Sequence, residues 1–315
     1  MHIPDGFLDV KTSAATAALA AGALGLGLKQ VRENLPPARV PLLGLAAAFV
    51  FAGQMLNFPI AGGTSGHMVG SVLAAVLLGP GAAMVALTAV LLVQCLVFAD
   101  GGLLALGANV FNMGVIGAVL GWGIHRLAWR ALGGHTLAAA VAAAAFAAWF
   151  ATVLAAVCCA AELAASGTVA ARVVFPAMAG VHALIGVGEA IITALVIAAV
   201  GRARPELLGV GVMGGNESGK NYGALLGYGI GAALALAAFL SPFASKLPDG
   251  LDRVAETHGF AESARKFFTL APAPDYQLPG VGSVSLATAL AGVAGTLVVF
   301  ALAWLLARAL ARRRT

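Results

Sequence analysis

Long apolar stretches separated by short polar connections repeat along the whole chain. They lie at about residues 8–28, 41–57, 68–78, 82–98, 103–127, 137–163, 177–200, 222–240 and 285–306. A helix that crosses the hydrocarbon core of a bilayer needs roughly 17–25 apolar residues, and all of these stretches except the third reach that length. The pattern predicts an all-α, polytopic membrane protein with about nine transmembrane helices, the third too short to cross unaided.

The composition supports a membrane protein and disfavours the other classes. Hydrophobic residues make up 61% of the 315 positions and charged residues 10%, whereas an ordinary soluble domain has about 25% charged residues. A β-barrel is disfavoured because the apolar runs are unbroken rather than alternating. Residues 1–8 lack the basic region of a signal peptide, so the mature chain is expected to start at Met1. Cys95, Cys158 and Cys159 lie inside apolar runs, where cysteine acts as a small hydrophobe.

Basic residues in the short connections indicate an orientation in the membrane. With the amino terminus outside, the inner connections and tail carry Lys29, Arg32, Arg39, Arg126, Arg130, Arg202, Arg204, Lys220, Arg308 and Arg312-Arg313-Arg314. Only Lys11 and Arg172 then fall in short outer loops. The positive-inside rule therefore predicts an extracytoplasmic amino terminus and a cytoplasmic carboxyl terminus in the cytoplasmic (inner) membrane.

The first eight residues, MHIPDGFL, contain a possible metal chelate. The Met1 amine, the His2 amide nitrogen and Nδ1 of the His2 imidazole are close enough along the chain to close two small rings around one ion. One further imidazole would complete a square-planar set of four nitrogens, which favours Ni(II) or Cu(II) over Zn(II). A single histidine near a terminus is more often incidental, so the rest of the chain has to support this interpretation.

His67 is the candidate for the fourth nitrogen. It ends a glycine-rich connector, residues 61–67, on the same outer side as residue 1. Irregular backbone at membrane depth has to be buried in protein or line a cavity, and a cavity is what a metal site needs. The alternative is a helix-capping Ser65 beside an interfacial histidine.

Polar residues within the apolar stretches are expected to face the bundle interior, because exposing them to lipid is costly. They are Gln54, Asn57, Gln94, Asn109, Asn112, His182 and Glu189. His182 and Glu189 share a helix face, and interhelical hydrogen bonding is favoured over an ion path. Asp5, Ser65 and Asn109 are candidates for orienting a ligand imidazole.

Residues 202–221 form a polar, glycine-rich stretch without an apolar span. Within it, residues 214–221 match the spacing of a phosphate-binding loop as far as Lys220. Asn221 replaces the serine or threonine that would hold magnesium, and no strand precedes the motif. Nucleotide binding is therefore rejected here, and the stretch is interpreted as a linker.

Three motifs carry a family resemblance. MHIPDGFL, the segment GGTSGH at 62–67 and the run GANVFNMG at 107–114 resemble the substrate-specific (M-type) component of energy-coupling-factor transporters for nickel and cobalt. The resemblance covers about residues 1–205. It implies a seven-helix bundle with the amino terminus inserted as a plug, and a metal held by the Met1 amine, the His2 amide and imidazole nitrogens, and the His67 imidazole. The Pro4-Asp5 pair is more similar to nickel members than to cobalt members.

A second resemblance lies in the outer loop of the last section, residues 245–283. Its motif Pro248-Asp249-Gly250-Leu251-Asp252 resembles the PDGLE sequence of the two-helix (N-type) accessory subunit, with Asp252 in place of the glutamate. The expected domains are 1–205, a cytoplasmic linker at 206–220, and an accessory unit at 221–315. The implied role is to load metal or seat the amino terminus. The alternative is that these acidic residues belong to a solvated loop helix without such a role.

The expected function is capture of a divalent transition metal for ATP-driven uptake, with Ni(II) preferred as the transported ligand and no cofactor. The resemblance implies a transmembrane (T-type) coupling protein and cytoplasmic ATP-binding cassette ATPases as partners, besides the bilayer and without nucleic acid. Co(II) uptake and a secondary ion-coupled transporter are the alternatives. An enzyme is disfavoured, because His182 with Glu189 is the only candidate for a catalytic pair.

Overall fold

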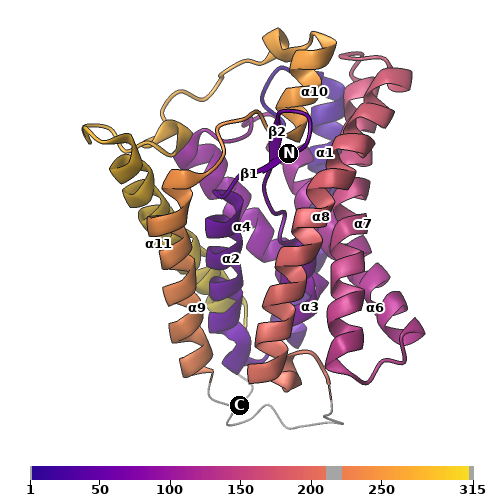
Figure 1. The fold of residues 1–315 in the computed structure, drawn as a ribbon, viewed down its shortest axis with the longest axis vertical. Helices are drawn as coiled ribbons and strands as arrows, with labels where there is room; N and C mark the ends of the chain where they lie inside the picture. The colour runs from indigo at the N-terminus through magenta and orange to yellow at the C-terminus, as the bar shows by residue number, and fades with distance from the viewer. Residues whose placement is uncertain (1, 211–221, 312–315) are drawn as a thin grey trace.

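The computed structural model describes residues 2–210 and 222–311 as a bundle of helices (Figure 1). The phosphate-loop-like stretch at 214–221 lies outside the described residues. Eight helical segments of the described chain are long and apolar enough to cross a membrane. They are α1 (Val10–Asn34), η1 and α2 (Pro37–Arg39, Val40–Gln54), α4 (Pro80–Phe98), α5, η2 and α6 (Leu106–Asn109, Val110–Leu120, Gly121–Ala131), α7 (Leu137–Ala165), α8 (Ala171–Ala203), α9, η4 and η5 (Gly223–Ala235, Leu236–Leu240, Ser241–Phe243), and α11 (Val284–Leu310).

The third apolar stretch is a half-length crossing, and this refines the expectation of about nine helices to eight long ones within the described chain. After α2 the chain forms a two-stranded hairpin, β1 (Phe58–Ile60) and β2 (Thr64–Gly66), continues without regular secondary structure through residues 67–70, and then forms α3 (Ser71–Leu78). Figure 1 shows the hairpin at one end of the bundle and α3 toward the other. Residues 55–70, called here the re-entrant segment, therefore lead the chain into the bundle without a helix.

The start of α3 is fixed by a carboxylate from another helix. Glu189 on α8 is 1% exposed, and its two oxygens accept hydrogen bonds from the backbone N–H groups of Val69 (2.6 Å) and Gly70 (2.9 Å). The first N–H groups of a helix have no partner within the helix, and no water replaces one in a membrane interior. The bonds confirm the interhelical role expected for Glu189.

Small residues bring the helices into close contact, as the composition indicates. A side chain at Gly186 on α8 would collide with Trp149 on α7, and one at Gly295 on α11 would collide with Phe51 on α2. The buried face of α7 is built largely of alanines. Packing in lipid depends on such contacts because apolar side chains gain little by leaving lipid for protein.

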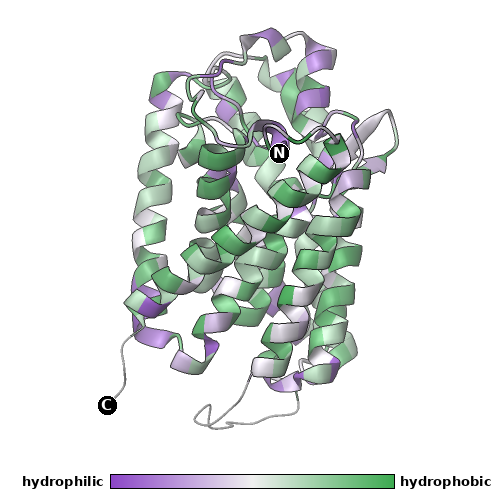
Figure 2. Ribbon diagram, turned by 90° about the vertical axis from the view of Figure 1, so that its left-hand side faces the viewer, coloured by the Kyte–Doolittle hydropathy of each residue, from purple (hydrophilic) through white to green (hydrophobic). Residues whose placement is uncertain are grey.

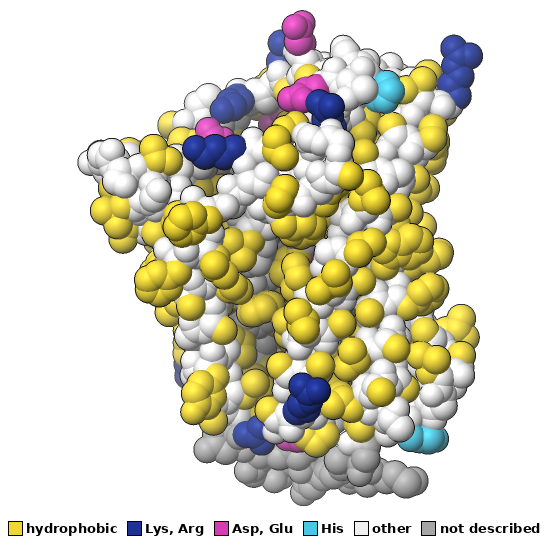
Figure 3. Space-filling view, in the orientation of Figure 1, with side chains coloured by type: hydrophobic (Ala, Val, Ile, Leu, Met, Phe, Trp, Pro, Cys, Tyr) yellow, Lys and Arg dark blue, Asp and Glu magenta, His cyan; other side chains and the backbone are white. Residues whose placement is uncertain are grey.

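The last two spans, α9 and α11, both pack against α2, and α11 also contacts α4 and α1. A loop joins them over one end of the molecule, and it contains α10 (Gly250–His258) and two short turns, η6 (Ala261–Ser263) and η7 (Pro274–Tyr276). Figure 2 shows hydrophobic residues along the middle of the helices and hydrophilic ones toward the ends. Figure 3 shows the same distribution on one face, where charged side chains gather at the two ends. This is the pattern of a chain whose middle lies in lipid.

The role of Glu189 can be tested by Glu189→Gln, which puts an amide N–H₂ group against one of the two backbone donors. We expect a loss of about 1–3 kcal/mol in the free energy of unfolding, because a buried donor loses its acceptor. The measurement is the thermal unfolding midpoint in detergent. Thr193→Val, one turn further along α8 at a buried hydroxyl, is the matched control. Equal midpoints for the two variants would contradict the assignment.

Candidate metal site

The amino-terminal segment, residues 2–8, enters the bundle as irregular chain ahead of α1. Figure 1 places this end of the chain beside the β1–β2 hairpin and α10. Ile3 is 0% and Phe7 2% exposed, and the Phe7 ring packs edge-on against Phe260 of the loop, with 5.2 Å between centroids. Pro4 lacks an N–H group and Gly6 has φ of +92°, so the sequence turns here instead of starting a helix. The segment is a plug, as the resemblance implies.

Asn109 fastens the plug by gripping the backbone of Ile3. Its side-chain oxygen accepts the Ile3 N–H (2.8 Å) and its side-chain nitrogen donates to the Ile3 carbonyl (3.1 Å). The N–H of Gly102 also donates to this carbonyl (2.9 Å). Asn109 is 2% exposed, so both bonds are sheltered from water. This residue holds the peptide next to His2, whereas the sequence suggested that it would orient an imidazole.

Asp5 fastens the plug at a second point, again through backbone. Its carboxylate accepts hydrogen bonds from the N–H groups of Leu103 (3.1 Å), Leu104 (2.7 Å) and Ala105 (3.2 Å), just before α5. A side chain at Gly102 would collide with Asp5, which explains the glycine there. These bonds place Asp5 on the turn at 103–105, away from the imidazole-orienting role suggested by the sequence.

His2 and His67 come together where the plug meets the re-entrant segment. Their rings are stacked, with centroids 5.1 Å apart and planes 26° apart. His2 Nε2 lies 3.1 Å from Gln94 Oε1, and His2 Nδ1 lies 3.4 Å from Asp100 Oδ1. His67 Nδ1 lies 2.9 Å from the Met68 carbonyl. Because a carbonyl only accepts, His67 carries its proton on Nδ1 and its lone pair on Nε2.

The PDGLD motif lies directly over His67. Ser65 holds the loop there, because its hydroxyl donates to the Leu247 carbonyl (2.7 Å) and its N–H to the Pro248 carbonyl (2.8 Å). Asp249 Oδ2 is 4.0 Å from His67 Nε2. Ser65 thus seats the accessory loop on the hairpin instead of orienting an imidazole.

The remaining motif residues explain how Asp249 is presented. Asp249 caps α10 by accepting from the N–H groups of Leu251 (2.8 Å) and Asp252 (2.9 Å). A side chain at Gly250 would collide with His182 and Ile185 of α8, so only glycine allows this approach. Leu251 is 0% exposed and anchors the helix in the core, whereas Asp252 is exposed and borders the cavity described next.

A polar cavity of about 510 Å³ opens beside the two histidines. Its walls come from the plug, α2, the re-entrant segment, the turn after α4 and the accessory loop. They include His2, Gln54, Asn57, His67, Asp100, Lys246, Asp249, Asp252 and Tyr276. Tyr276 from the loop donates to Asp100 Oδ2 (2.6 Å), so the accessory unit also forms the wall opposite α10.

Burial keeps the two imidazoles in the form that binds metals. It lowers the pKa of His2, although Asp100 opposes the change, and it lowers the pKa of His67 well below its usual value. Burial acts in the opposite direction on Asp249, yet the pKa of that carboxyl is lowered, and the hydrogen bond from the Asp252 N–H is one of the causes. Metal ligation requires neutral imidazoles, so both rings have the protonation state that a metal ligand would need.

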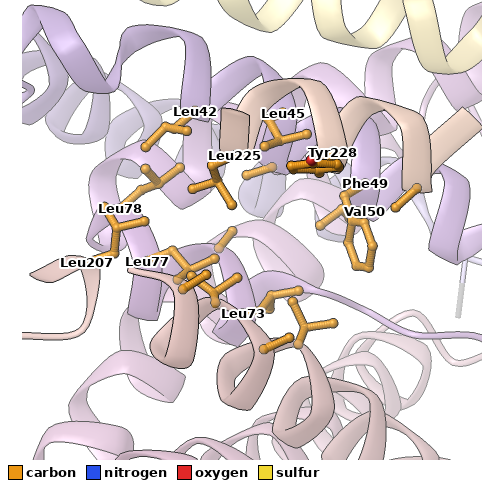
Figure 4. Close-up of a pocket in the computed structure, with 18 of the residues that line it drawn as sticks. Leu42, Leu45, Phe49, Val50, Leu73, Leu77, Leu78, Leu207, Leu225 and Tyr228 are labelled. Carbon is orange, nitrogen blue, oxygen red and sulfur yellow. The ribbon is translucent and has the colours of Figure 1, made fainter. Parts of the chain in front are cut away.

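Side chains alone do not form a metal-binding group anywhere in the described chain, the two histidines included. In residues 2–210 and 222–311, no three side chains of His, Cys, Asp or Glu are grouped for metal binding. Met1, the first expected ligand, lies outside this part of the structure. An apolar cavity of about 410 Å³ lies between α2, α3, α8 and α9, and Figure 4 shows the leucines that line it with Phe49, Val50 and Tyr228. Its lining supplies no metal ligand of the usual kinds.

Several residues of the site were not singled out from the sequence. Gln54 and Gln94 appeared only among polar residues expected to face inward, and Asp100 and Tyr276 did not appear at all. Asp100 follows α4 in a turn with Gly101 and Gly102, and Tyr276 lies in a long loop. No periodicity marks such positions, so only the pairing of the two segments reveals them.

Comparison with known proteins places the chain among metal transporters. The model of a family described as "Cobalt uptake substrate-specific transmembrane region" matches residues 2–207, and a PDGLE domain matches residues 223–312. A protein from Archaeoglobus fulgidus described as a putative fused nickel transport protein NikMN is 36% identical over 313 residues, covering 98% of each chain. The cobalt transport protein CbiM of Geobacter sulfurreducens is 34% identical over 218 residues, covering 66% of this chain and 61% of that one. The crystal structure of a truncated transition metal transporter superposes with a TM-score of 0.58 at 36% identity, covering 64% of this chain and 99% of that one.

The grip of Asn109 on the plug can be tested with Asn109→Ala. Losing two buried hydrogen bonds should loosen the plug by about 1–2 kcal/mol, which corresponds to roughly 5–30-fold faster exchange. Hydrogen–deuterium exchange of peptides covering residues 2–8 and 100–105 measures this. Asn112→Ala is the matched control, because Asn112 is equally buried but donates to Glu162. Similar exchange in both peptides for the two variants would refute the anchoring role.

Proposed function

Since the chain belongs to the cobalt uptake substrate-specific transmembrane family and continues into a PDGLE domain, we propose that it captures Ni(II) as the substrate-binding component of an ATP-driven uptake transporter. The observation that carries the proposal is the stacking of His2 on His67 at the inner end of a buried plug. Two histidines 65 positions apart in the sequence have no structural need to bring neutral rings together, whereas binding one metal ion would require it.

The proposed ligands are four nitrogens. His67 contributes Nε2, the nitrogen left with its lone pair by the bond to Met68. His2 contributes Nδ1 and its amide nitrogen, and the Met1 amine completes two chelate rings. Such a set imposes a square-planar geometry, which suits Ni(II). The proposal requires a free amine on residue 1.

Charge balance supports a dication at this place. Asp100 faces His2 Nδ1 at 3.4 Å and Asp249 faces His67 Nε2 at 4.0 Å. A cation between the two ligand nitrogens would therefore be flanked by a carboxylate on each side. Together with the amide proton lost on binding, they would offset the cost of moving a dication out of water.

Uptake requires a route in and a route out. The cavity beside the histidines lies under the accessory loop, so we propose that metal enters there from the extracytoplasmic side. Inward release then requires the plug or the re-entrant segment to move. We propose that a T-type coupling protein and cytoplasmic ATPases drive this step, since the described chain presents no nucleotide-binding motif of its own. Co(II) uptake by the same ligands is the alternative.

The chelate can be tested by inserting two alanines between Met1 and His2. The insertion preserves every side chain but moves the histidine to position 4, which changes the ring sizes and the reach of the amine; a single alanine would instead create an amine, two amides and a histidine at position 3, which bind Ni(II) in a plane by themselves. We expect nickel binding to fall by at least 100-fold in calorimetric titration of the purified protein. Two alanines inserted between Gly282 and Ser283, in an exposed part of the loop, control for insertion itself.

The fourth ligand can be tested by His67→Ala, with His258→Ala as the control at an exposed histidine of the loop. The first variant should fold and lose nickel binding, and the second should bind normally. Retained affinity after either the insertion at position 2 or His67→Ala would remove that ligand from the proposal.

Metal preference can be tested by competition between Ni(II) and Co(II). A nitrogen set held in a plane should bind Ni(II) more tightly, by at least 10-fold, in line with the Irving–Williams order. Square-planar Ni(II) is diamagnetic, so the loaded protein should show no paramagnetic shifts in its NMR spectrum. Tighter Co(II) binding, or a paramagnetic nickel complex, would favour the alternative.

A further inference from the structure

We propose that two consecutive backbone carbonyls, those of Met68 and Val69, fix the tautomers of both histidines, and that Gln54 and Gln94 are the positioning residues that carry this effect to His2. For His67 the bond is direct, as described above. For His2 the effect passes through the two side-chain amides, which we call the amide relay. The role of His2 as a metal ligand rests on the proposed function, but its tautomer does not.

The relay is a continuous row of hydrogen bonds inside the bundle. Gln54 Nε2 on α2 is 2.8 Å from the Val69 carbonyl, Gln94 Nε2 on α4 is 2.8 Å from Gln54 Oε1, and Gln94 Oε1 is 3.1 Å from His2 Nε2. Gln54 is 4% and Gln94 0% exposed. Gln94 is therefore sheltered from water that could offer it other partners, and Gln54 meets water only where it borders the polar cavity.

The direction of every bond in the row follows from its first member. A backbone carbonyl can only accept, so the Gln54 atom that faces Val69 has to be the N–H₂ group. The other end of Gln54 is then its oxygen, which has to receive a proton from the N–H₂ group of Gln94. The remaining end of Gln94 is its oxygen, and the ring nitrogen facing it has to be a donor. His2 therefore carries its proton on Nε2.

This tautomer leaves the lone pair of His2 on Nδ1, the nitrogen that can close a chelate ring with the His2 amide. Without the relay the equilibrium between the two tautomers of His2 would shift, because Asp100 Oδ1 lies 3.4 Å from Nδ1 and would attract a proton to that nitrogen. Asp100 is itself held by the Tyr276 hydroxyl. The relay thus counteracts the effect of Asp100, because it keeps the proton of His2 on Nε2.

The Val69 peptide, from which the amide relay starts, is held in place by separate hydrogen bonds. The N–H groups of Val69 and Gly70 donate to Glu189, which orients the peptides on either side of Val69. The carbonyls of Met68 and Val69 then point to His67 and Gln54, respectively. One irregular stretch, residues 67–70, therefore supplies a ligand and prepares both imidazoles. Partners bonded to the second ring nitrogen commonly tune metal-binding histidines in this way.

The test is nitrogen-15 NMR of histidine-labelled, metal-free protein at neutral pH. His2→Ala and His67→Ala spectra assign the two rings. The proposal expects His2 to show a protonated Nε2 and a pyridine-type Nδ1, and His67 the reverse. In Gln94→Met, which preserves side-chain shape but removes the amide, the Nδ1-protonated form of His2 should increase. Gln54→Met should give a smaller change in the same direction.

Gln94→Glu separates orientation from packing, because one carboxyl oxygen still accepts from His2 Nε2 and the other, protonated at this buried position, donates to Gln54 Oε1. The Gln94→Glu variant should keep the His2 tautomer of the unmodified protein. Gln277→Met serves as the control, because the Gln277 amide lies in the loop and donates to Thr288 of α11, and this variant should leave the tautomer unchanged. Nickel affinity should fall roughly 10–100-fold in Gln94→Met and recover in Gln94→Glu. A His2 protonated on Nδ1 in the unmodified protein, or unchanged in Gln94→Met, would overturn the proposal. If the unmodified protein bound no nickel, the proposed function would fail while the tautomer result would stand.

Discussion

The structure depends on one constraint, which is that backbone polar groups inside a membrane have to find partners within the protein. The chain departs from helix between α2 and α3, and buried peptide groups there are satisfied by side chains from two helices, α8 and α2. Glu189 accepts the N–H groups of Val69 and Gly70, and Gln54 donates to the Val69 carbonyl. These bonds make a non-helical segment tolerable at that depth. Because that segment carries His67, they also determine where an imidazole can meet the amino-terminal plug.

The site is an assembly of four non-helical segments that bind one another through backbone. The plug is held by the turn at 100–105 and by Asn109, the hairpin is held to the accessory loop by Ser65, and the loop returns to the plug through the N–H of Arg265, which donates to the Asp5 carbonyl (2.6 Å). Their mutual bonds explain why substitutions at positions other than the histidines, such as Gly102 or Gly250, would disturb the site.

The accessory unit takes part in the site, so its fusion to the first bundle has structural meaning. Asp249 reaches His67, and Tyr276 holds the carboxylate beside His2. The loop thus contributes to the charge and to the walls of the cavity as well as covering it. A loop in this position could control both access and the electrostatic environment of a bound cation, and its motif matches the PDGLE domain.

The sequence by itself determined the membrane-spanning class, the positions of the long helices and the two histidines, because hydrophobic length and a histidine at position 2 are local signals. It also located the PDGLD motif. From the sequence, Asp5, Ser65 and Asn109 were expected to orient an imidazole, whereas in the fold their side chains form hydrogen bonds with backbone groups. The sequence does not reveal this, because the partner of a polar side chain depends on which distant segments pack together. Gln54 and Gln94 are 40 positions apart, and neither gives a sign of its partner. Only the tertiary structure aligned them between the Val69 carbonyl and His2, since the direction of a hydrogen-bond chain is a property of packed neighbours and not of sequence order.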